Sequence, residues 1–312
     1  IQHSASVVPV AVPLLGEGAT SPTITDSFTQ LPTPQADVLF IVDDSCSMSE
    51  EQGNLGTNLG AFLTYAQTAM VDYQIAVTTT DVDFGLRGAF TNQGGARIIT
   101  PMTANASSVF NRNVNFGTGG SSTEQGLEAA YLALTAPNIT MNNLGFIRPT
   151  AALAIVVVSD EEDFSPRQVS FYENFFRNIK GFANSSQFSF SAIVTPIGGC
   201  RPGGASDGAR YIQIAQATGG VVESICTANW GNTLSNIGLN TFGLGSRFNL
   251  SAQPVQSTIA VRVDGAAVTA VTGGGQTQWR YDGATNSVNF QTGFVPVANS
   301  VIEVTYTVAC LR

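Results

Sequence analysis

The chain has 312 residues, of which 43% are apolar and 11% are charged, and it carries a formal net charge of -9. This length allows one large domain with a buried core plus a smaller domain. The negative charge and the single lysine, Lys180, argue against a nucleic-acid-binding surface. No run of about 18 apolar residues is present, so no membrane-spanning helix is expected.

Residues 1–35 are rich in proline, and we expect them to form an extended N-terminal arm with a strand near residues 23–28. From Asp37 onward, apolar strand-like runs alternate with helical periodicity. Strands are predicted at 37–42, 73–80, 96–100, 152–159, 188–195 and 221–222. Helices are predicted after Ser47 and around 127–134, 165–179, 209–217 and 230–237. This alternation predicts an α/β domain over 36–250, with a Rossmann-like, doubly wound and mostly parallel sheet covered on both faces.

The first of these helices has a clear apolar face. Its spacing predicts that six residues point toward the core, namely Leu55, Leu59, Phe62, Leu63, Ala66 and Met70.

Residues 251–312 follow a different pattern, in which apolar and polar side chains alternate around the Asp-Gly turns at 264–265 and 282–283. This pattern predicts a small antiparallel β domain. At roughly 60 residues it is near the lower limit for independent stability, so we expect it to pack on the large domain. The N-terminal arm is a candidate for an extra strand of this domain.

One motif places several oxygen-bearing side chains at the end of a strand. The apolar run at 37–42 leads directly into Asp43, Ser45 and Ser47, which precede the first helix. Ligands of an open parallel sheet bind at the carboxyl ends of its strands, where Asp160 and the loop 117–124 should also lie. Carboxylate and hydroxyl oxygens suit a hard divalent cation such as Mg²⁺. The sequence therefore predicts a cation site at this edge.

With these residues the sequence resembles the von Willebrand factor A (VWA) domain family over about residues 37–243. The metal-ion-dependent adhesion site (MIDAS) of that family has an Asp-x-Ser-x-Ser run, a Thr in a second loop and an Asp after the central strand. The matching positions are Asp43, Ser45, Ser47, Thr123 and Asp160, with Thr118 and Ser122 as alternatives to Thr123. Val-Ser-Asp-Glu at 158–161 replaces the usual Thr-Asp-Gly, so the loop at Asp160 has lost the family's glycine.

The resemblance implies how this site works. The hydroxyls of Ser45, Ser47 and Thr123 would contact the cation, while Asp43 and Asp160 would act mostly through water. Mg²⁺, with Mn²⁺ and Ca²⁺ as alternatives, would keep one coordination position for a carboxylate of a partner.

Further acidic residues are expected to surround the site, at its rim or just behind the residues that contact the cation. They are Asp44, Asp81, Asp83, Glu124, Glu161 and Glu162. With Asp163, the residues Asp44, Glu161 and Glu162 form either a solvated acidic face or a second cation site.

The four cysteines suggest an oxidising compartment. A Cys200–Cys226 disulfide would close the segment 201–225 and stabilise it by about 3 kcal/mol. Cys46 and Cys310 either form a second disulfide, which would tie the β domain to the rim of the site, or stay free.

These features favour binding over catalysis. The only histidine is His3, in the N-terminal arm, and no nucleophile elbow or phosphate-binding loop is present. The resemblance implies a secreted or cell-surface adhesion protein, placed at a bacterial outer surface or in a periplasm, that captures an acidic group of a protein or glycan. The alternatives are a structural subunit of a surface fibre or pilus tip and a metal-assisted hydrolase, with Glu161 or Glu124 as its base.

Overall fold

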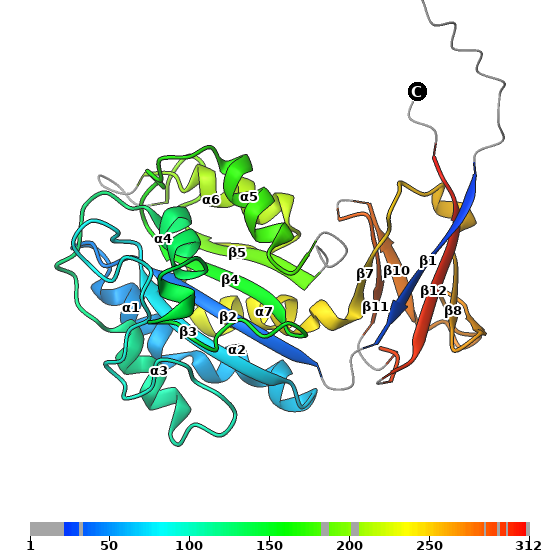
Figure 1. Ribbon diagram of the computed structural model, residues 1–312, viewed down its shortest axis with the longest axis horizontal. Helices are drawn as coiled ribbons and strands as arrows, with labels where there is room; N and C mark the ends of the chain where they lie inside the picture. The colour runs from blue at the N-terminus through cyan, green and yellow to red at the C-terminus, as the bar shows by residue number, and fades with distance from the viewer. Residues whose placement is uncertain are drawn as a thin grey trace, which may run out of the picture.

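The computed structural model describes residues 22–30, 34–181, 187–200, 206–283, 285–291, 294–297 and 299–309. These residues form an α/β domain and a smaller β domain, which lie side by side as two lobes (Figure 1). The fold class predicted from the sequence is confirmed, since a parallel sheet flanked by helices and separate antiparallel sheets are both present. None of the helices in the described ranges has the length and apolar character needed to cross a membrane.

A five-stranded sheet forms the centre of the α/β domain, in the order β3-β2-β4-β5-β6. Its strands are β2 (Gln35–Val42), β3 (Asp72–Thr79), β4 (Ala152–Ser159), β5 (Phe188–Val194) and β6 (Val222–Ser224), and every neighbouring pair is parallel. The strand expected at 96–100 is reduced to one antiparallel bridge between Ile99 and Ile75. The interior strand β4 is buried along its whole length, which explains its unbroken run of apolar residues.

Helices cover both faces of this sheet. One face carries α1 (Ser49–Thr57), α2 (Leu59–Thr68), α3 (Ala106–Val114) and α7 (Trp230–Phe242); the other carries α4 (Gly126–Ala133), α5 (Val169–Asn178) and α6 (Ala209–Ala217), with the short turn η1 (Asn138–Thr140) beyond α4. Side chains of β2 point alternately into the two cores, one on each face of the sheet. Phe40 packs against Phe62 and Phe110, with ring centroids 5.3 and 5.1 Å apart, while Leu39 and Ile41 enter the opposite core.

The first helical segment is divided at Asn58 into α1 and α2, and α2 ends at Thr68. Met70 lies beyond this end, with a φ of 50° and a side chain that is 81% exposed. The prediction that Met70 packs on the helical face is therefore wrong. The helix stops before the periodic pattern does, and the chain turns there toward β3.

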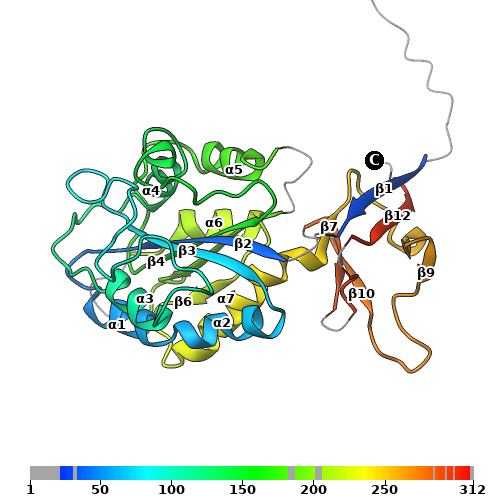
Figure 2. The ribbon, with the colours of Figure 1, turned by 60° about the horizontal axis from the view of Figure 1, so that its bottom comes forward.

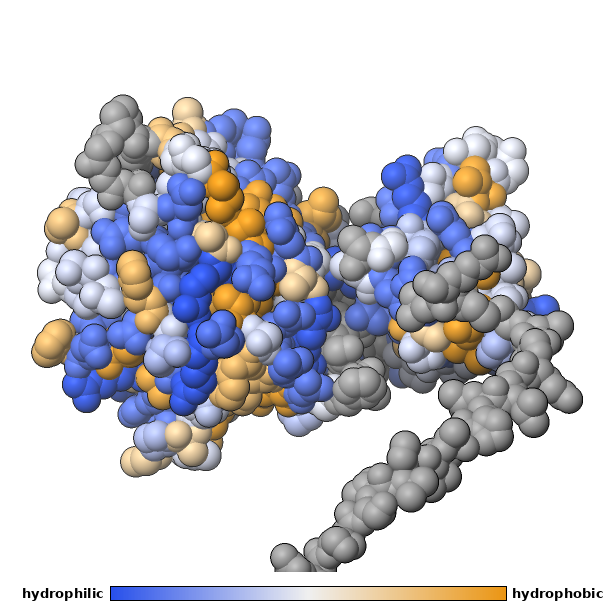
Figure 3. Space-filling view, turned by 90° about the horizontal axis from the view of Figure 1, so that it is seen from above, coloured by the Kyte–Doolittle hydropathy of each residue, from blue (hydrophilic) through white to orange (hydrophobic). Residues whose placement is uncertain are grey.

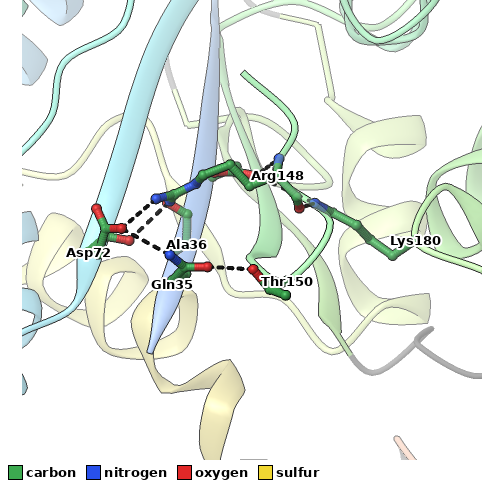
Figure 4. Close-up of polar contacts among 7 residues, drawn as sticks. Gln35, Ala36, Asp72, Arg148, Thr150 and Lys180 are labelled. Atoms are coloured by element: carbon green, nitrogen blue, oxygen red, sulfur yellow. Dashed lines mark hydrogen bonds and ion pairs between the residues drawn. The ribbon is translucent and has the colours of Figure 1, made fainter. Parts of the chain in front are cut away.

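A buried polar cluster lies at the amino ends of the strands (Figure 4). Asp37 is fully buried; its Oδ1 accepts from Arg148 Nε at 2.7 Å and its Oδ2 from the Arg148 backbone N at 2.8 Å. The guanidinium also donates to the carbonyl oxygens of Ala36 at 3.1 Å and Asp72 at 3.0 Å. Lys180 Nζ lies 3.4 Å from Asp37 Oδ2 and donates to the carbonyl of Arg148. This cluster fastens β2 to β3.

The β domain has two antiparallel sheets with an apolar core between them. One sheet holds β1 (Thr23–Thr29), β12 (Val301–Thr307), β8 (Ala260–Val263) and β9 (Ala266–Val268); the other holds β10 (Trp279–Asp282), β11 (Ser287–Phe290) and β7 (Arg247–Asn249). The short helices η3 (Gly243–Ser246) and η4 (Gln256–Thr258) flank β7 and β8. Residues before and after the α/β domain thus share this domain, because β1 pairs with β12 along seven residue pairs.

The two domains meet at the end of α6. A Cβ added to Gly219 would come within 2.4 Å of the Thr285 side chain of the β domain, so this position requires a residue without a side chain. Figures 1 and 2 show that β2 begins near the β domain and ends at the far side of the α/β domain. The carboxyl ends of the parallel strands therefore face away from the β domain.

The cysteine predictions have different outcomes. The Cys200–Cys226 disulfide is present and joins the loop after β5 to the end of β6. Cys46 is a free and exposed thiol in the loop after β2, at the edge of the sheet that faces away from the β domain. The expected Cys46–Cys310 disulfide is therefore wrong for Cys46, and Cys310 itself lies outside the described residues.

Candidate metal-binding site

Asp43 is the innermost residue of the site at the carboxyl edge of the sheet. Its backbone N donates to Val158 O at 2.9 Å, so the residue prolongs the pairing of β2 with β4. The side chain is fully buried; Oδ1 accepts from the Ser45 backbone N at 2.7 Å and Oδ2 from the Ser159 hydroxyl at 2.6 Å. Burial raises the pKa of Asp43, although these hydrogen bonds favour its carboxylate. The turn after β2 and the end of β4 together fix this carboxyl group.

Two serines connect Asp43 to the loop after β4. Ser45 Oγ lies 3.2 Å from Ser47 Oγ, and the Ser47 hydroxyl donates to Asp160 Oδ1 at 3.0 Å. The Thr195 hydroxyl at the end of β5 donates to the Asp160 carbonyl at 2.9 Å, which holds this loop against the sheet. Ser45 and Asp160 are buried, whereas Ser47 is exposed. The structure thus brings four of the predicted ligands together, with the open side at Ser47.

Thr123, the fifth predicted ligand, is placed differently. The residue is exposed, and its backbone N donates to Ser121 Oγ at 3.0 Å. Within the described part of the chain, its hydroxyl makes no hydrogen bond to the other four predicted ligands, and neither do the hydroxyls of the alternatives Thr118 and Ser122. A role for a hydroxyl of this loop in holding a cation therefore stays a prediction.

The loop 117–124 nevertheless packs closely on the loop after β2. Gln52 Nε2 donates to the carbonyls of both Asp43 and Gly117, at 3.0 and 2.9 Å. Gly120 N donates to the Asp44 carbonyl at 2.8 Å, and a Cβ at Gly120 would lie 2.3 Å from Asp44 Cγ. Gly120 is thus needed for the close approach of the two loops.

Two further carboxyl groups lie buried behind the predicted ligands. Glu124 is fully buried; its Oε2 accepts from the Thr80 hydroxyl, whereas its Oε1 has no hydrogen-bond partner. Burial and the neighbouring Asp43 carboxylate raise the pKa of Glu124 to about 9. Asp44 is 9% exposed, its Oδ1 also has no partner, and burial together with Asp81 and Asp43 raises its pKa to about 7. The carboxyl groups of Glu124 and Asp44 are thus buried inside the site and do not lie at its rim.

The acidic residues 161–163, which follow β4, have two different roles. Glu161 stays beside Asp160 and is half-buried, and burial with the charge of Asp43 raises its pKa. Glu162 accepts from the backbone N of Ala209 and of Arg210, both at 3.1 Å, and so satisfies the start of α6.

Asp163 also serves the scaffold, because it accepts from Leu127 N at 3.1 Å and lies 3.1 Å from Arg210 Nε. Glu162 and Asp163 thus contact the starts of α6 and α4, and a second cation site at this edge stays a prediction.

The acidic residues after β3 shape their own loop. Asp81 is buried and its Oδ1 accepts from the backbone N of Asp83 and Phe84, at 2.8 and 2.9 Å. Burial alone would raise the pKa of Asp81, but these backbone donors outweigh it and lower the pKa. Asp83 is exposed, and its Oδ2 accepts from Gln125 Nε2 at 3.3 Å. Asp83 alone of this pair lies at the surface of the rim.

This donor set fits a divalent cation. Among the described residues, no Lys, Arg or His forms an ion pair with Asp43, Asp44 or Glu124. Without a positive charge such buried groups tend to stay protonated, in line with the raised pKa values of Asp44 and Glu124, and a metal ion among them would favour their carboxylate forms. No three His, Cys, Asp or Glu side chains in the described ranges are grouped so as to hold a metal ion, so a cation at this edge would need hydroxyl oxygens such as those of Ser45 and Ser47.

Three neutral residues that hold the site together were not predicted from the sequence. Ser159 and Thr80 end or follow central strands and donate to Asp43 and Glu124, and Gln52 of α1 joins two loops. A polar residue at the carboxyl end of an otherwise apolar strand was the available signal for Ser159 and Thr80.

No protein-family model matches the sequence, and no curated protein matches it. Among solved structures, the chain is similar to proximal thread matrix protein 1 from the mussel byssus, with 10% identity and a TM-score of 0.40 over 70% of this chain and 48% of that one. A further structure of the mussel protein has a zinc-occupied MIDAS motif.

The chain is also similar to the pilus adhesin SpaC from Lactobacillus rhamnosus GG in its open conformation, with 11% identity and a TM-score of 0.41 over 92% of this chain and 41% of that one. BatB, a conserved hypothetical protein from Bacteroides thetaiotaomicron, matches with 13% identity and a TM-score of 0.39 over 67% and 98%. The chain spans about half the length of the mussel protein and less than half of SpaC.

Proposed function

We propose that the protein is an extracellular adhesion or ligand-binding protein of the VWA type that acts through a divalent cation, and that it is not an enzyme. Its cation would be held by Asp43, Ser45, Ser47 and Asp160, with Mg²⁺ as the preferred ion and a hydroxyl of the loop 117–124 as a further ligand. The observation that carries this proposal is the hydrogen-bonded series Ser45–Ser47–Asp160 above the buried Asp43.

Each residue of this series has a defined task. The Ser47 hydroxyl donates to Asp160 and therefore accepts from the Ser45 hydroxyl, which leaves one lone pair of its oxygen to face a cation. Asp43 is held rigidly by donors from Ser45 and Ser159, and its charge lies beneath the two serines. When bound, the ion would supply an unneutralised positive charge to a carboxylate of the partner.

The surroundings of the site favour a protein partner over a glycan. Phe84, Phe164 and Ile197 follow β3, β4 and β5, and they are 87%, 56% and 65% exposed. Because these strands are parallel, the three side chains lie in loops at the same edge as Asp43. Figure 3 shows a face of the molecule that is mostly hydrophilic, with several apolar patches. Exposed apolar side chains beside a polar site are typical of protein–protein contact surfaces.

The Cys200–Cys226 disulfide supports a secreted or cell-surface location, because such bonds persist in oxidising compartments. A structural role in a surface fibre is the second candidate, since the β domain lies at the end of the molecule opposite the site (Figure 1). In that case the cation would only stabilise the fold.

Direct cation binding tests the proposal. We expect the wild-type protein to bind Mn²⁺, followed by electron paramagnetic resonance, and Mg²⁺, followed by calorimetry. Ser47→Ala and Asp160→Ala should each abolish binding, whereas Ser49→Ala, an exposed serine at the start of α1, should bind like the wild type. Retained binding in Ser47→Ala would refute the assignment.

Adhesion is measured separately, on a panel of immobilised extracellular proteins and glycans, in MgCl₂ and in EDTA. The proposal expects capture of a protein that EDTA abolishes while the melting transition stays cooperative. Loss of the folded state in EDTA would support the structural role instead, and capture of glycans alone would contradict a protein partner.

A further inference from the structure

Glu124 is much more deeply buried than the residues beside it in the sequence. It precedes α4 in a loop that is otherwise half-exposed, yet its own side chain is fully buried. Its carbonyl accepts from Phe164 N at 2.6 Å, and the next residue, Gln125, donates its backbone N to Thr80 O at 3.2 Å. Glu124 is thus fixed between the end of β3 and the loop after β4, the two segments that flank Asp43.

Only half of the Glu124 carboxyl group is satisfied. Oε2 accepts from the Thr80 hydroxyl, while Oε1 is buried and has no hydrogen-bond partner. The charged neighbours that act on it are Asp43, Glu161 and Asp44, with Asp43 the strongest, and all carry the same sign. An unpartnered carboxyl oxygen among other carboxylates is unfavourable unless a positive charge lies within reach.

We propose that Glu124 belongs to the cation site, where the ion or a water bound to it is the missing partner of Oε1. This inference rests on the proposed function, because it adds a residue to the same site. The sequence places Glu124 among the acidic residues around the site, whereas this inference gives it a contact with the ion or with a water bound to it.

The added carboxylate changes what the site does. Asp43, Asp160 and Glu124 together bring more negative charge to the ion than a set with two carboxylates. The site therefore binds its cation more tightly before any partner arrives, and less positive charge is left for the partner's carboxylate. Thr80 is the positioning residue, because its hydroxyl holds Oε2 and so directs Oε1.

The test compares Glu124→Gln with Glu50→Gln. Gln keeps the shape of Glu124 and an oxygen that accepts from Thr80 but removes the charge, while Glu50 is an exposed glutamate in the first turn of α1 at the same end of the domain. Mn²⁺ affinity is measured by electron paramagnetic resonance, and melting temperatures are recorded in EDTA and in MgCl₂. Thr80→Val serves as a second variant that leaves the charge of Glu124 in place.

We expect Glu124→Gln to weaken Mn²⁺ binding by about tenfold or more, as is usual when an outer partner of a metal site is lost. Glu50→Gln should bind like the wild type, and Thr80→Val should be weakened to a smaller extent. In EDTA, Glu124→Gln should melt close to the wild-type temperature, because without the ion a pKa of about 9 leaves Glu124 protonated and as neutral as Gln. In MgCl₂ the variant should melt below the wild type, because it gains less from the ion.

Unchanged Mn²⁺ affinity in Glu124→Gln, with binding lost in Ser47→Ala, would overturn this inference and leave the proposed function intact. Absence of Mn²⁺ binding by the wild-type protein would overturn both. If Glu124→Gln fails to fold, unchanged affinity in Thr80→Val would count against the inference.

Discussion

Replacing Arg148 by Met removes the cation that fastens the amino ends of β2 and β3 (Figure 4). The change takes one charged hydrogen bond from Asp37, at 2.7 Å, and leaves the carbonyls of Ala36 and Asp72 without the guanidinium. The contact with the Asp72 carboxylate at 2.8 Å adds little, because that side chain is 44% exposed. Most of the loss therefore comes from Asp37, whose side chain is fully buried.

Breaking a buried ion pair by removing one partner costs about 3–5 kcal/mol, because the other charge stays buried. Asp37 keeps two donors in the variant, the backbone N of residue 148 at 2.8 Å and Lys180 Nζ at 3.4 Å. We therefore expect the lower end of this range, about 3 kcal/mol of unfolding free energy at pH 7.

The loss should depend on pH in a definite direction. Burial raises the pKa of Asp37 above its ordinary value of 3.8, and Arg148 opposes this increase. Without Arg148 the pKa of Asp37 rises further, so the folded state binds a proton that the unfolded state has released. Stability then falls as pH rises from 3.8 through the folded pKa. The loss of unfolding free energy in Arg148→Met, relative to the wild type, should therefore be smaller near pH 4 than at pH 7.

Urea unfolding followed by circular dichroism at 222 nm measures this effect. The α-helices of the described residues all lie in the α/β domain, so the signal reports on that domain alone. A loss of about 3 kcal/mol shifts the midpoint by about 1 M or more, at a slope of about 2–3 kcal/mol/M. Arg112→Met, at an exposed position of α3, is the control and should stay within about 0.5 kcal/mol of the wild type. A deficit below about 1 kcal/mol, or one that grows toward acid pH, would refute the reasoning.

Two further changes test local features. Gly120→Ala should weaken Mn²⁺ binding, because its Cβ would lie 2.3 Å from Asp44 Cγ. Gly119→Ala is the control and should bind normally, since no atom lies within 4 Å of the added carbon. Equal Mn²⁺ affinities of the two variants would show that the close approach of the loops is unimportant for binding. Reduction of the Cys200–Cys226 disulfide should lower the unfolding free energy by about 3 kcal/mol. A urea midpoint that is the same with and without reductant would contradict the second expectation.

The sequence predicts the fold well because the interior strand β4 is made almost entirely of Val, Ile, Leu and Ala. Such runs fit only the interior of a sheet covered on both faces, and β4 is buried throughout. The helix after Ser47 was predicted less well, because apolar periodicity continues across the break at Asn58 and beyond the end of α2 to Met70. Apolar periodicity indicates which residues share a helical face, but it does not indicate where the helix ends.

The site residues that directly follow a strand can be predicted from the sequence, because the carboxyl ends of parallel strands meet at one edge of the sheet. Asp43, Ser45, Ser47 and Asp160 meet for this reason. The loop 117–124 follows no strand directly, so which of its side chains turns inward depends on close contacts such as that of Gly120 with Asp44. These contacts bury Glu124 and leave Thr123 exposed, which spacing along the chain could not indicate.

The clearest distinction lies between two aspartates at opposite ends of β2. Asp37 and Asp43 are both fully buried, and burial raises the pKa of both. Asp37 is surrounded by Arg148 and Lys180, so its charge is balanced within the chain and its task is to hold strands together. Among the described residues, Asp43 is met by neutral donors and by other carboxylates. A buried carboxylate without a basic partner is stabilised by a positive charge from outside the chain, and this contrast supports the proposal of a cation at the carboxyl edge of the sheet over one at the amino edge.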